Sequence, residues 1–283
     1  MTGRRETERA RRFAAEDGVV LSARFWGDAG APVTLLLHGG GANGSWWSPL
    51  VQAVAALGVE QQFVALDFRG HGDSDYPQDT RVGAFHGDVE SLLAHLDLEA
   101  REYGLVGHSL GAHVALDHAA CHPPVRSVMA IEPSRGGSKG DRRRARLALA
   151  ARRTHRTRQD ALDRFRFLPG APLADDALRL RIAERSIRRE PDGRYGYSFD
   201  PRWFRLPAKP PEPKSRIACP VLVVRGGDSG LLTHEGAALL AREIPDGRVL
   251  EIPGTGHNVH LERPDRVAEA LAAQLGAGAR AAS

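Results

Sequence analysis

The chain has 283 residues, of which 42% are hydrophobic, and this is enough to build one large α/β domain around a substantial buried core. Its basic start lacks the apolar segment of a signal peptide, and no run of about 18 apolar residues could cross a membrane. We therefore expect a soluble, cytoplasmic protein with no membrane partner. The two cysteines, Cys121 and Cys219, lack the spacing and density of a disulfide framework, which argues against a structural disulfide.

The net charge of +4 is distributed unevenly, and one segment of the chain is strongly basic. Between Arg135 and Arg189 there are 17 Lys and Arg residues against 6 Asp and Glu residues, a balance of +11. Nucleic acid is the first partner to consider for such a segment. However, it has no zinc-finger, RNP or homeodomain-like pattern, and its arginines alternate with Ala and Leu at helical spacing. We expect solvated helix faces and no nucleic-acid partner, with attraction of an acidic substrate or acyl carrier as the alternative.

In chain order, a hairpin comes first and an alternating series follows. Two strand-like runs, 11–16 and 19–26, flank Asp17-Gly18, a dipeptide that is typical of hairpin turns. Continuous apolar runs, which suit strands buried on both faces, then alternate with helix-like stretches. The expected strands are 33–37, 62–68, 101–107 and 125–132, and the expected helices are 45–57, 81–96 and 110–120. This alternation predicts a parallel, doubly wound sheet.

The alternation is interrupted once, from Pro133 to near Ser215. Arg-rich helical segments and Pro- and Gly-rich connections occupy this stretch. The series then resumes with an expected strand at 221–227, a helix at 234–244, a strand at 248–252 and a terminal helix at 264–275. We therefore expect a core domain made of residues 1–133 and 216–283, with a helical unit inserted at 134–215.

The first glycine cluster, 39–44, suggests a dinucleotide site. It matches G-x-G-x-x-G, follows a strand and precedes a helix, and Asp67 stands at the end of the next strand. Three features oppose an NAD(P)-dependent oxidoreductase. A hairpin precedes the supposed first strand, Trp46 and Trp47 occupy the helix start that should approach a pyrophosphate, and the sequence has no Tyr-x-x-x-Lys pair. An oxidoreductase is therefore the least favoured function.

The second motif is G-x-S-x-G at 107–111, between the strand 101–107 and the helix 110–120. A serine on a sharp strand-to-helix turn projects its hydroxyl outward, flanking glycines relieve crowding, and the helix N-terminus stabilises negative charge. A second match at 136–140, around Ser138, has no strand leading into it. The structural setting therefore selects Ser109 as the nucleophile.

A serine nucleophile needs a base that is oriented by a third group. The chain offers these partners in the order Ser, Asp, His, which is the order in α/β-type serine hydrolases. Asp228 follows the strand 221–227 and His257 follows the strand 248–252, so both would lie with Ser109 at the carboxyl edge of the sheet. Glu132, at the end of the strand 125–132, is the alternative acid. The sequence predicts a triad of Ser109, His257 and Asp228, with Glu132 left open.

The reaction also needs two backbone donors for an oxyanion. The turn at 38–41 supplies one from Gly40, and the amide of Leu110 supplies the other. This assignment explains the first glycine cluster without a nucleotide.

Five ordered motifs, spread over nearly the whole chain, resemble the α/β-hydrolase superfamily. They are His-Gly-Gly-Gly at 38–41, Asp-Phe-Arg-Gly-His-Gly-Asp-Ser at 67–74, Gly-His-Ser-Leu-Gly at 107–111, Gly-Asp-Ser at 227–229 and Gly-His at 256–257 before Glu-Arg-Pro at 262–264. The resemblance implies a mostly parallel eight-stranded sheet with helices on both faces and a helical cap inserted after the sixth strand. That position coincides with the insertion at 134–215.

The resemblance also implies an enzyme that needs no cofactor, and the residues suggest no metal site. Three histidines on or near the helix behind Ser109, His113, His118 and His122, are spaced five and four residues apart. This spacing does not place them well on one metal-binding face.

Departures from particular branches of the superfamily narrow the expected activity. Dehalogenases and epoxide hydrolases carry aspartate where Ser109 stands, and proline iminopeptidases carry proline where Gly41 stands. Carbon–carbon bond hydrolases often carry asparagine where His108 stands. The resemblance therefore implies hydrolysis of a small carboxylic ester, lactone or thioester through an acyl-enzyme, with an acyl-carrier or CoA-linked substrate as one option for the basic segment. A C–C bond hydrolase and a non-hydrolytic lyase or cyclase remain as alternatives.

Overall fold

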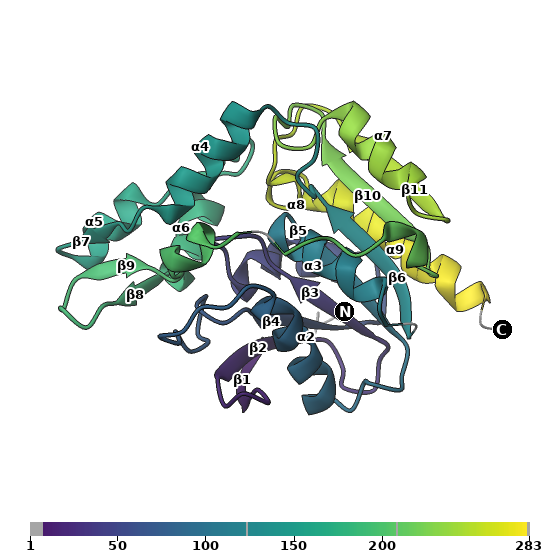
Figure 1. The fold of residues 1–283 in the computed structure, drawn as a ribbon, viewed down its shortest axis with the longest axis horizontal. Helices are drawn as coiled ribbons and strands as arrows, with labels where there is room; N and C mark the ends of the chain where they lie inside the picture. Colours follow the sequence, from purple (N-terminus) through teal and green to yellow (C-terminus); the bar gives the residue numbers. More distant parts are fainter. Residues whose placement is uncertain (1–7, 123, 208, 282–283) are drawn as a thin grey trace.

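An eight-stranded sheet runs through the computed structural model, which describes residues 8–122, 124–207 and 209–281 (Figure 1). The strands are β1 (Arg9–Ala14), β2 (Val20–Trp26), β3 (Val33–Leu37), β4 (Gln62–Asp67), β5 (Tyr103–His108), β6 (Val125–Ile131), β10 (Val221–Gly226) and β11 (Gly247–Ile252). Their order across the sheet is β1-β2-β4-β3-β5-β6-β10-β11. The β1–β2 and β2–β4 pairs are antiparallel and all other pairs are parallel. The expected fold class is confirmed.

The N-terminal hairpin forms where the Asp17-Gly18 signal predicts it. Ala14 pairs with Val20 across the turn, and Gly18 has a φ of +82°, a conformation that residues with a Cβ rarely adopt. The central strands are buried along their whole length because their sequences are continuous apolar runs rather than alternating ones.

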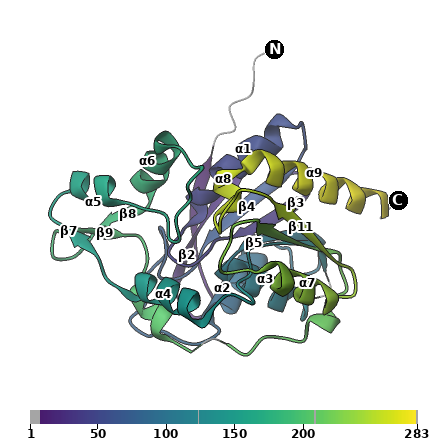
Figure 2. The ribbon, with the colours of Figure 1, turned by 90° about the horizontal axis from the view of Figure 1, so that it is seen from above.

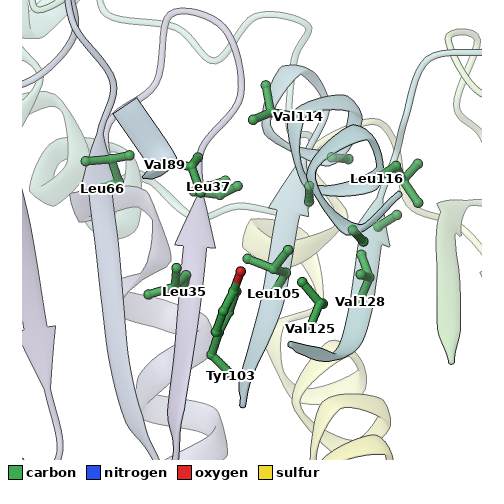
Figure 3. Packing of buried hydrophobic residues seen from close by; sticks show 14 of the residues in the cluster. Leu35, Leu37, Leu66, Val89, Tyr103, Leu105, Val114, Leu116, Val125 and Val128 are labelled. Atoms are coloured by element: carbon green, nitrogen blue, oxygen red, sulfur yellow. The ribbon is translucent and has the colours of Figure 1, made fainter. Parts of the chain in front are cut away.

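Helices cover both faces of the sheet (Figures 1 and 2). One face packs on α2 (Ala84–His95), α3 (Leu110–Ala119) and α7 (His234–Arg242), and the other packs on α1 (Ser48–Ala56), α8 (Val259–Glu262) and α9 (Pro264–Ala281). Successive strand residues point to opposite faces, so Leu35 and Leu37 join the first cluster and Leu36 joins the second. Figure 3 shows Leu35, Leu37 and Leu105 beneath Val114 of α3. This packing fixes α3, which begins directly after Ser109.

The chain leaves the sheet after β6 and returns to it at β10. We call the intervening residues 134–215 the insert; Figures 1 and 2 show its helices to one side of the main sheet. Its elements are α4 (Lys139–Ala150), β7 (Thr154–His155), α5 (Arg158–Arg164), α6 (Asp176–Arg185), β8 (Ile187–Arg189), β9 (Tyr195–Tyr197), η2 (Pro201–Arg205) and η3 (Lys214–Arg216). The short strands form an antiparallel sheet in the order β7-β9-β8.

The insert is attached to the loops that follow β3 and β4. Ser186 Oγ lies 3.1 Å from both Asn43 Nδ2 and Trp46 Nε1, which donate hydrogen bonds to it. Trp46 also packs in a hydrophobic cluster with Phe165 and Phe167 of the insert. These contacts hold the insert over the carboxyl ends of the central strands. Among the described residues, no helix combines the length and apolar character that a membrane crossing requires.

Candidate active site

Ser109 stands on a strained turn between β5 and α3. Its φ of 50° and ψ of −111° lie in a region that residues with a Cβ rarely adopt. The flanking glycines are required by close packing, because a Cβ on Gly107 would lie 2.3 Å from the Gly111 oxygen and one on Gly111 would lie 2.0 Å from the Leu37 oxygen. The Ser109 N–H is anchored on the Ile131 oxygen at 2.9 Å. The turn therefore fixes the serine at the N-terminus of α3.

Ser138, the serine of the second G-x-S-x-G match, has a different structural role. It is the N-cap of α4, where its Oγ accepts the Asp141 N–H at 3.0 Å and donates to Asp141 Oδ2 at 2.7 Å. Helix capping accounts for this serine. From the sequence it is set aside as the nucleophile because no strand leads into its motif.

Four of the predicted site residues meet at one cavity of about 250 Å³. Ser109, His257, Gly40 and Leu110 all line it. Leu110 is the first residue of α3, and the first N–H groups of a helix have no partner within the helix. The wall is completed by side chains of the insert, among them Leu149 and Phe204. A carbonyl group in this cavity would therefore meet a serine, an imidazole and the N-terminus of α3.

The carboxyl group that contacts His257 in the structure is not the one favoured from the sequence. His257 Nδ1 lies 2.9 Å from Glu132 Oε2, and both side chains are buried. Asp228, the acid favoured by the sequence, is exposed to solvent. Its backbone N–H bonds to the Thr255 oxygen at 2.9 Å. Glu132, which the sequence left open, is the partner of His257.

The packing around β10 explains this choice. A Cβ on Gly226 would lie 2.1 Å from the Gly256 oxygen, so the loop that carries His257 crosses directly over the end of β10. This brings the imidazole to β6, the strand next to β5 and its serine. Glu132 follows β6 with a φ of +54°, and its N–H bonds to the Val224 oxygen at 2.8 Å. The Asp228 side chain, two residues beyond β10, is exposed, although its N–H bonds to Thr255 of the same loop.

Two further donors hold the Glu132 carboxylate. The Gly226 N–H donates to Oε1 at 2.7 Å, and the Ser229 hydroxyl donates to Oε2 at 2.6 Å. Ser229 is a functional residue that the sequence analysis missed. Its signal was the Gly-Asp-Ser motif at 227–229, in which the aspartate was taken as the important residue.

Burial dominates the electrostatics of this pair. It raises the pKa of the Glu132 carboxyl to about 8, against the opposing effects of Ser229, Gly226 and the nearby Arg225. Burial also lowers the pKa of the His257 imidazole to about 4. Burial thus favours the neutral forms of both groups, and the neutral imidazole is the form that a general base requires.

Two other histidines brace the site through backbone groups. His108 Nε2 lies 2.9 Å from the His257 oxygen, and since a carbonyl can only accept, this nitrogen carries the proton. His38 Nε2 accepts the Phe68 N–H at 3.1 Å, which leaves Nδ1 to donate to the Gly39 oxygen at 2.8 Å. His108 thus ties the base loop to the nucleophile turn, and His38 ties the glycine turn to the end of β4. The sequence analysis gave neither histidine a role.

The dinucleotide interpretation also fails on geometry. Asp67, which should bind a ribose, is fully buried and accepts the Gly44 N–H at 2.6 Å and the Asp73 N–H at 2.9 Å. Its pKa is raised by burial to about 6. Gly39 and Gly40 instead line the cavity at Ser109. Within the described part of the chain, no group of three or more His, Cys, Asp and Glu side chains could hold a metal ion.

Comparison with known proteins decides the family. The model of a family described as the alpha/beta hydrolase family matches residues 34–270. The chain belongs to this family. An esterase of Mycobacterium tuberculosis is 28% identical over 259 residues, which cover 88% of this chain and 84% of that protein. A 2-(acetamidomethylene)succinate hydrolase of Mesorhizobium japonicum is 29% identical over 274 residues, which cover 89% of this chain and 90% of that protein.

The structural neighbours agree with this assignment. The crystal structure of an E-2-(acetamidomethylene)succinate hydrolase matches with a TM-score of 0.78 and 25% identity, over 95% of this chain and 100% of that one. A structure of the M. tuberculosis esterase matches with a TM-score of 0.78 over 97% of this chain and 93% of that one; at 23% identity it bears on the fold alone. The chain is an enzyme of the hydrolase class, as the sequence motifs predicted.

Substitution of the two candidate acids separates their roles. Glu132→Gln should lower kcat by about 10³- to 10⁴-fold, because an amide cannot stabilise the imidazolium or hold its tautomer as a carboxylate does. The measurement is steady-state hydrolysis of an activated ester, with circular dichroism as the control for folding. Asp228→Asn, a matched change at an exposed position, should alter kcat by less than about twofold. A large loss in Asp228→Asn with little change in Glu132→Gln would restore the assignment made from sequence.

Proposed function

We propose that this hydrolase cleaves a carboxylic ester, lactone or thioester of a small molecule, with Ser109 as nucleophile, His257 as base and Glu132 as the acid. The observation that carries the proposal is the buried hydrogen bond between His257 and Glu132 beside the cavity that Ser109 lines. A neutral imidazole hydrogen-bonded to a buried acidic side chain, next to a half-buried serine, is the arrangement that activates a hydroxyl near neutral pH.

The proposed reaction proceeds in two halves. His257 accepts the Ser109 proton while Oγ attacks the carbonyl carbon, and Glu132 stabilises the imidazolium that forms. The amides of Gly40 and Leu110 donate hydrogen bonds to the oxyanion. The imidazolium then gives its proton to the leaving oxygen or sulfur, and an acyl-enzyme remains. Water, deprotonated by the same imidazole, releases the acid and restores Ser109.

The insert serves as the cap in this proposal, with the core made of residues 1–133 and 216–283. Phe204 and Leu149 close the cavity from above, and a Cβ on Gly40 would lie only 2.6 Å from Phe204 Cε1. The cap therefore presses against the oxyanion turn. Such closure excludes water and strengthens each electrostatic interaction at the reacting carbonyl.

Removal of the nucleophile is the direct test of this function. Ser109→Ala should lower kcat by about 10⁴- to 10⁶-fold on any ester that the enzyme turns over, since the acyl-enzyme can no longer form. A fluorophosphonate should label the unaltered protein at Ser109, as identified by peptide mass spectrometry.

Ser138→Ala is the matched control, because this serine has the same local motif and serves as a helix cap. It should retain activity and labelling. Near-normal turnover in Ser109→Ala, or label on Ser138, would contradict the proposed function.

Analysis of the products distinguishes the alternative reactions. Conversion of a substrate without incorporation of oxygen from ¹⁸O-labelled water would favour the lyase or cyclase alternative. Release of a carbon fragment in place of an alcohol would favour the C–C hydrolase.

For the substrate we extend the proposal to acyl-carrier or CoA-linked thioesters. The support is the +11 balance between Arg135 and Arg189. Part of this excess is neutralised by acids outside the segment: Arg152 pairs with Glu190 at 3.1 Å and Arg135 with Glu243 at 2.7 Å. Only the remaining cations could attract an acidic carrier, so the preference should be modest.

Two thioesters with the same acyl group test this extension. The CoA thioester should have a kcat/KM several-fold above that of the N-acetylcysteamine thioester at low ionic strength, and the difference should shrink in about 0.5 M salt because salt screens surface charge. Equal kcat/KM values for the two substrates at low salt would rule out a contribution from the basic segment.

A further inference from the structure

A second, larger cavity adjoins the one at Ser109. It has a volume of about 980 Å³, and Leu110, His113 and Phe204 are among the residues that line both cavities. We call this larger cavity the α3 groove. The two spaces therefore adjoin at these residues.

The groove follows one face of α3 away from the serine. Leu110, His113, Val114 and Asp117 line it, and residues spaced by three, four and seven lie on the same side of a helix. At 1.5 Å per residue, the distance from Leu110 to Asp117 is about 10 Å. The opposite wall is the connection between η2 and η3, which includes Leu206 and Pro211. In Figure 1 this connection passes across α3 on its way to β10.

The groove passes apolar side chains before it ends at an ion pair. Leu110 and Phe204, together with the polar His113 and Arg146, lie at the end shared with the serine cavity, and Val114 follows on α3. At the far end the Asp117 carboxylate accepts hydrogen bonds from Lys214 Nζ and from the Glu212 N–H. Binding of a methylene chain is favourable along the apolar part of the groove. It becomes unfavourable at the ion pair, because contact there removes water from the charged groups.

The position of the groove decides which part of the substrate it receives. His257, which must protonate the leaving group, lines the cavity at Ser109, whereas the α3 groove begins at Leu110, the expected oxyanion donor. The leaving group must stay beside His257, and His257 does not line the α3 groove, so the groove is left to the other substituent of the reacting carbon. On the basis of the proposed function, we propose that the α3 groove binds the acyl chain of the substrate, and that this chain is unbranched, aliphatic and of medium length.

Two series of activated esters test this assignment on the unaltered enzyme. With the alcohol held constant, kcat/KM should rise by up to about fourfold per methylene from acetyl to octanoyl, the factor that corresponds to about 0.8 kcal/mol per buried methylene. It should level off or fall at dodecanoyl, whose chain reaches the charged end. With the acyl group held constant, lengthening the alcohol should have a much smaller effect. A steeper dependence on the alcohol than on the acyl chain would overturn the proposal.

A substitution at the far end gives an independent check. Val82 lines the groove and is 46% exposed, so a larger residue at this position should not disturb the core. The neighbouring Gly83 shows that the site faces the opposite wall, because a Cβ added to Gly83 would lie 3.8 Å from Lys209 Cδ. Val82→Trp should lower the ratio of kcat/KM for octanoyl over acetyl esters by at least about fivefold. Val249→Trp is the matched control, because Val249 is 39% exposed on β11 and should leave this ratio unchanged.

The outcomes separate this inference from the proposed function. Fluorophosphonate labelling of Ser109 reports an intact nucleophile in every variant. If Ser109 is labelled and esters are hydrolysed, but the octanoyl-to-acetyl ratio is the same in Val82→Trp and the unaltered enzyme, the groove assignment is wrong and the esterase function stands. If no ester is hydrolysed and Ser109 is not labelled, the function itself fails.

Discussion

The hydrogen bond between His257 and Glu132 is the interaction on which the site depends. Both side chains are buried, so neither group could be charged without the other and without the donors around the carboxylate. The Ser229 hydroxyl and the Gly226 N–H supply that support. The 252–257 loop crosses closely over Gly226, and the backbone at Glu132 is strained. Together these features bring Glu132, which follows β6, into contact with His257, which follows β11.

The rest of the fold places a substrate against this pair. The sheet brings β5 beside β6, so the serine turn and the acid are neighbours, and α3 contributes a helix N-terminus at the point where negative charge would develop. The insert then closes the cavity through Leu149 and Phe204. The α3 groove adjoins this space and shares Leu110, His113 and Phe204 with it. In our proposal the reacting groups lie in the smaller cavity, and the groove binds the acyl chain.

The sequence predicts most of the fold because its signals are local. Buried strands such as 33–37 read as continuous apolar runs, and the turn at Ser109 needs glycines at fixed offsets. The choice between Asp228 and Glu132 depends on a long-range fact, the crossing of one loop over β10, which no local pattern encodes. Both positions follow strands and both carry carboxylates. The groove could not be predicted for the same reason, since α3 and residues 206–215 are far apart in the chain.

The most direct test is a crystal structure of the enzyme after reaction with an alkyl phosphonate ester. We expect a phosphorus bonded to Ser109 Oγ, its free oxygen within hydrogen-bonding distance of the Gly40 and Leu110 N–H groups, and His257 still bonded to Glu132. Phosphorus on another residue, or His257 turned toward Asp228 in the adduct, would contradict it.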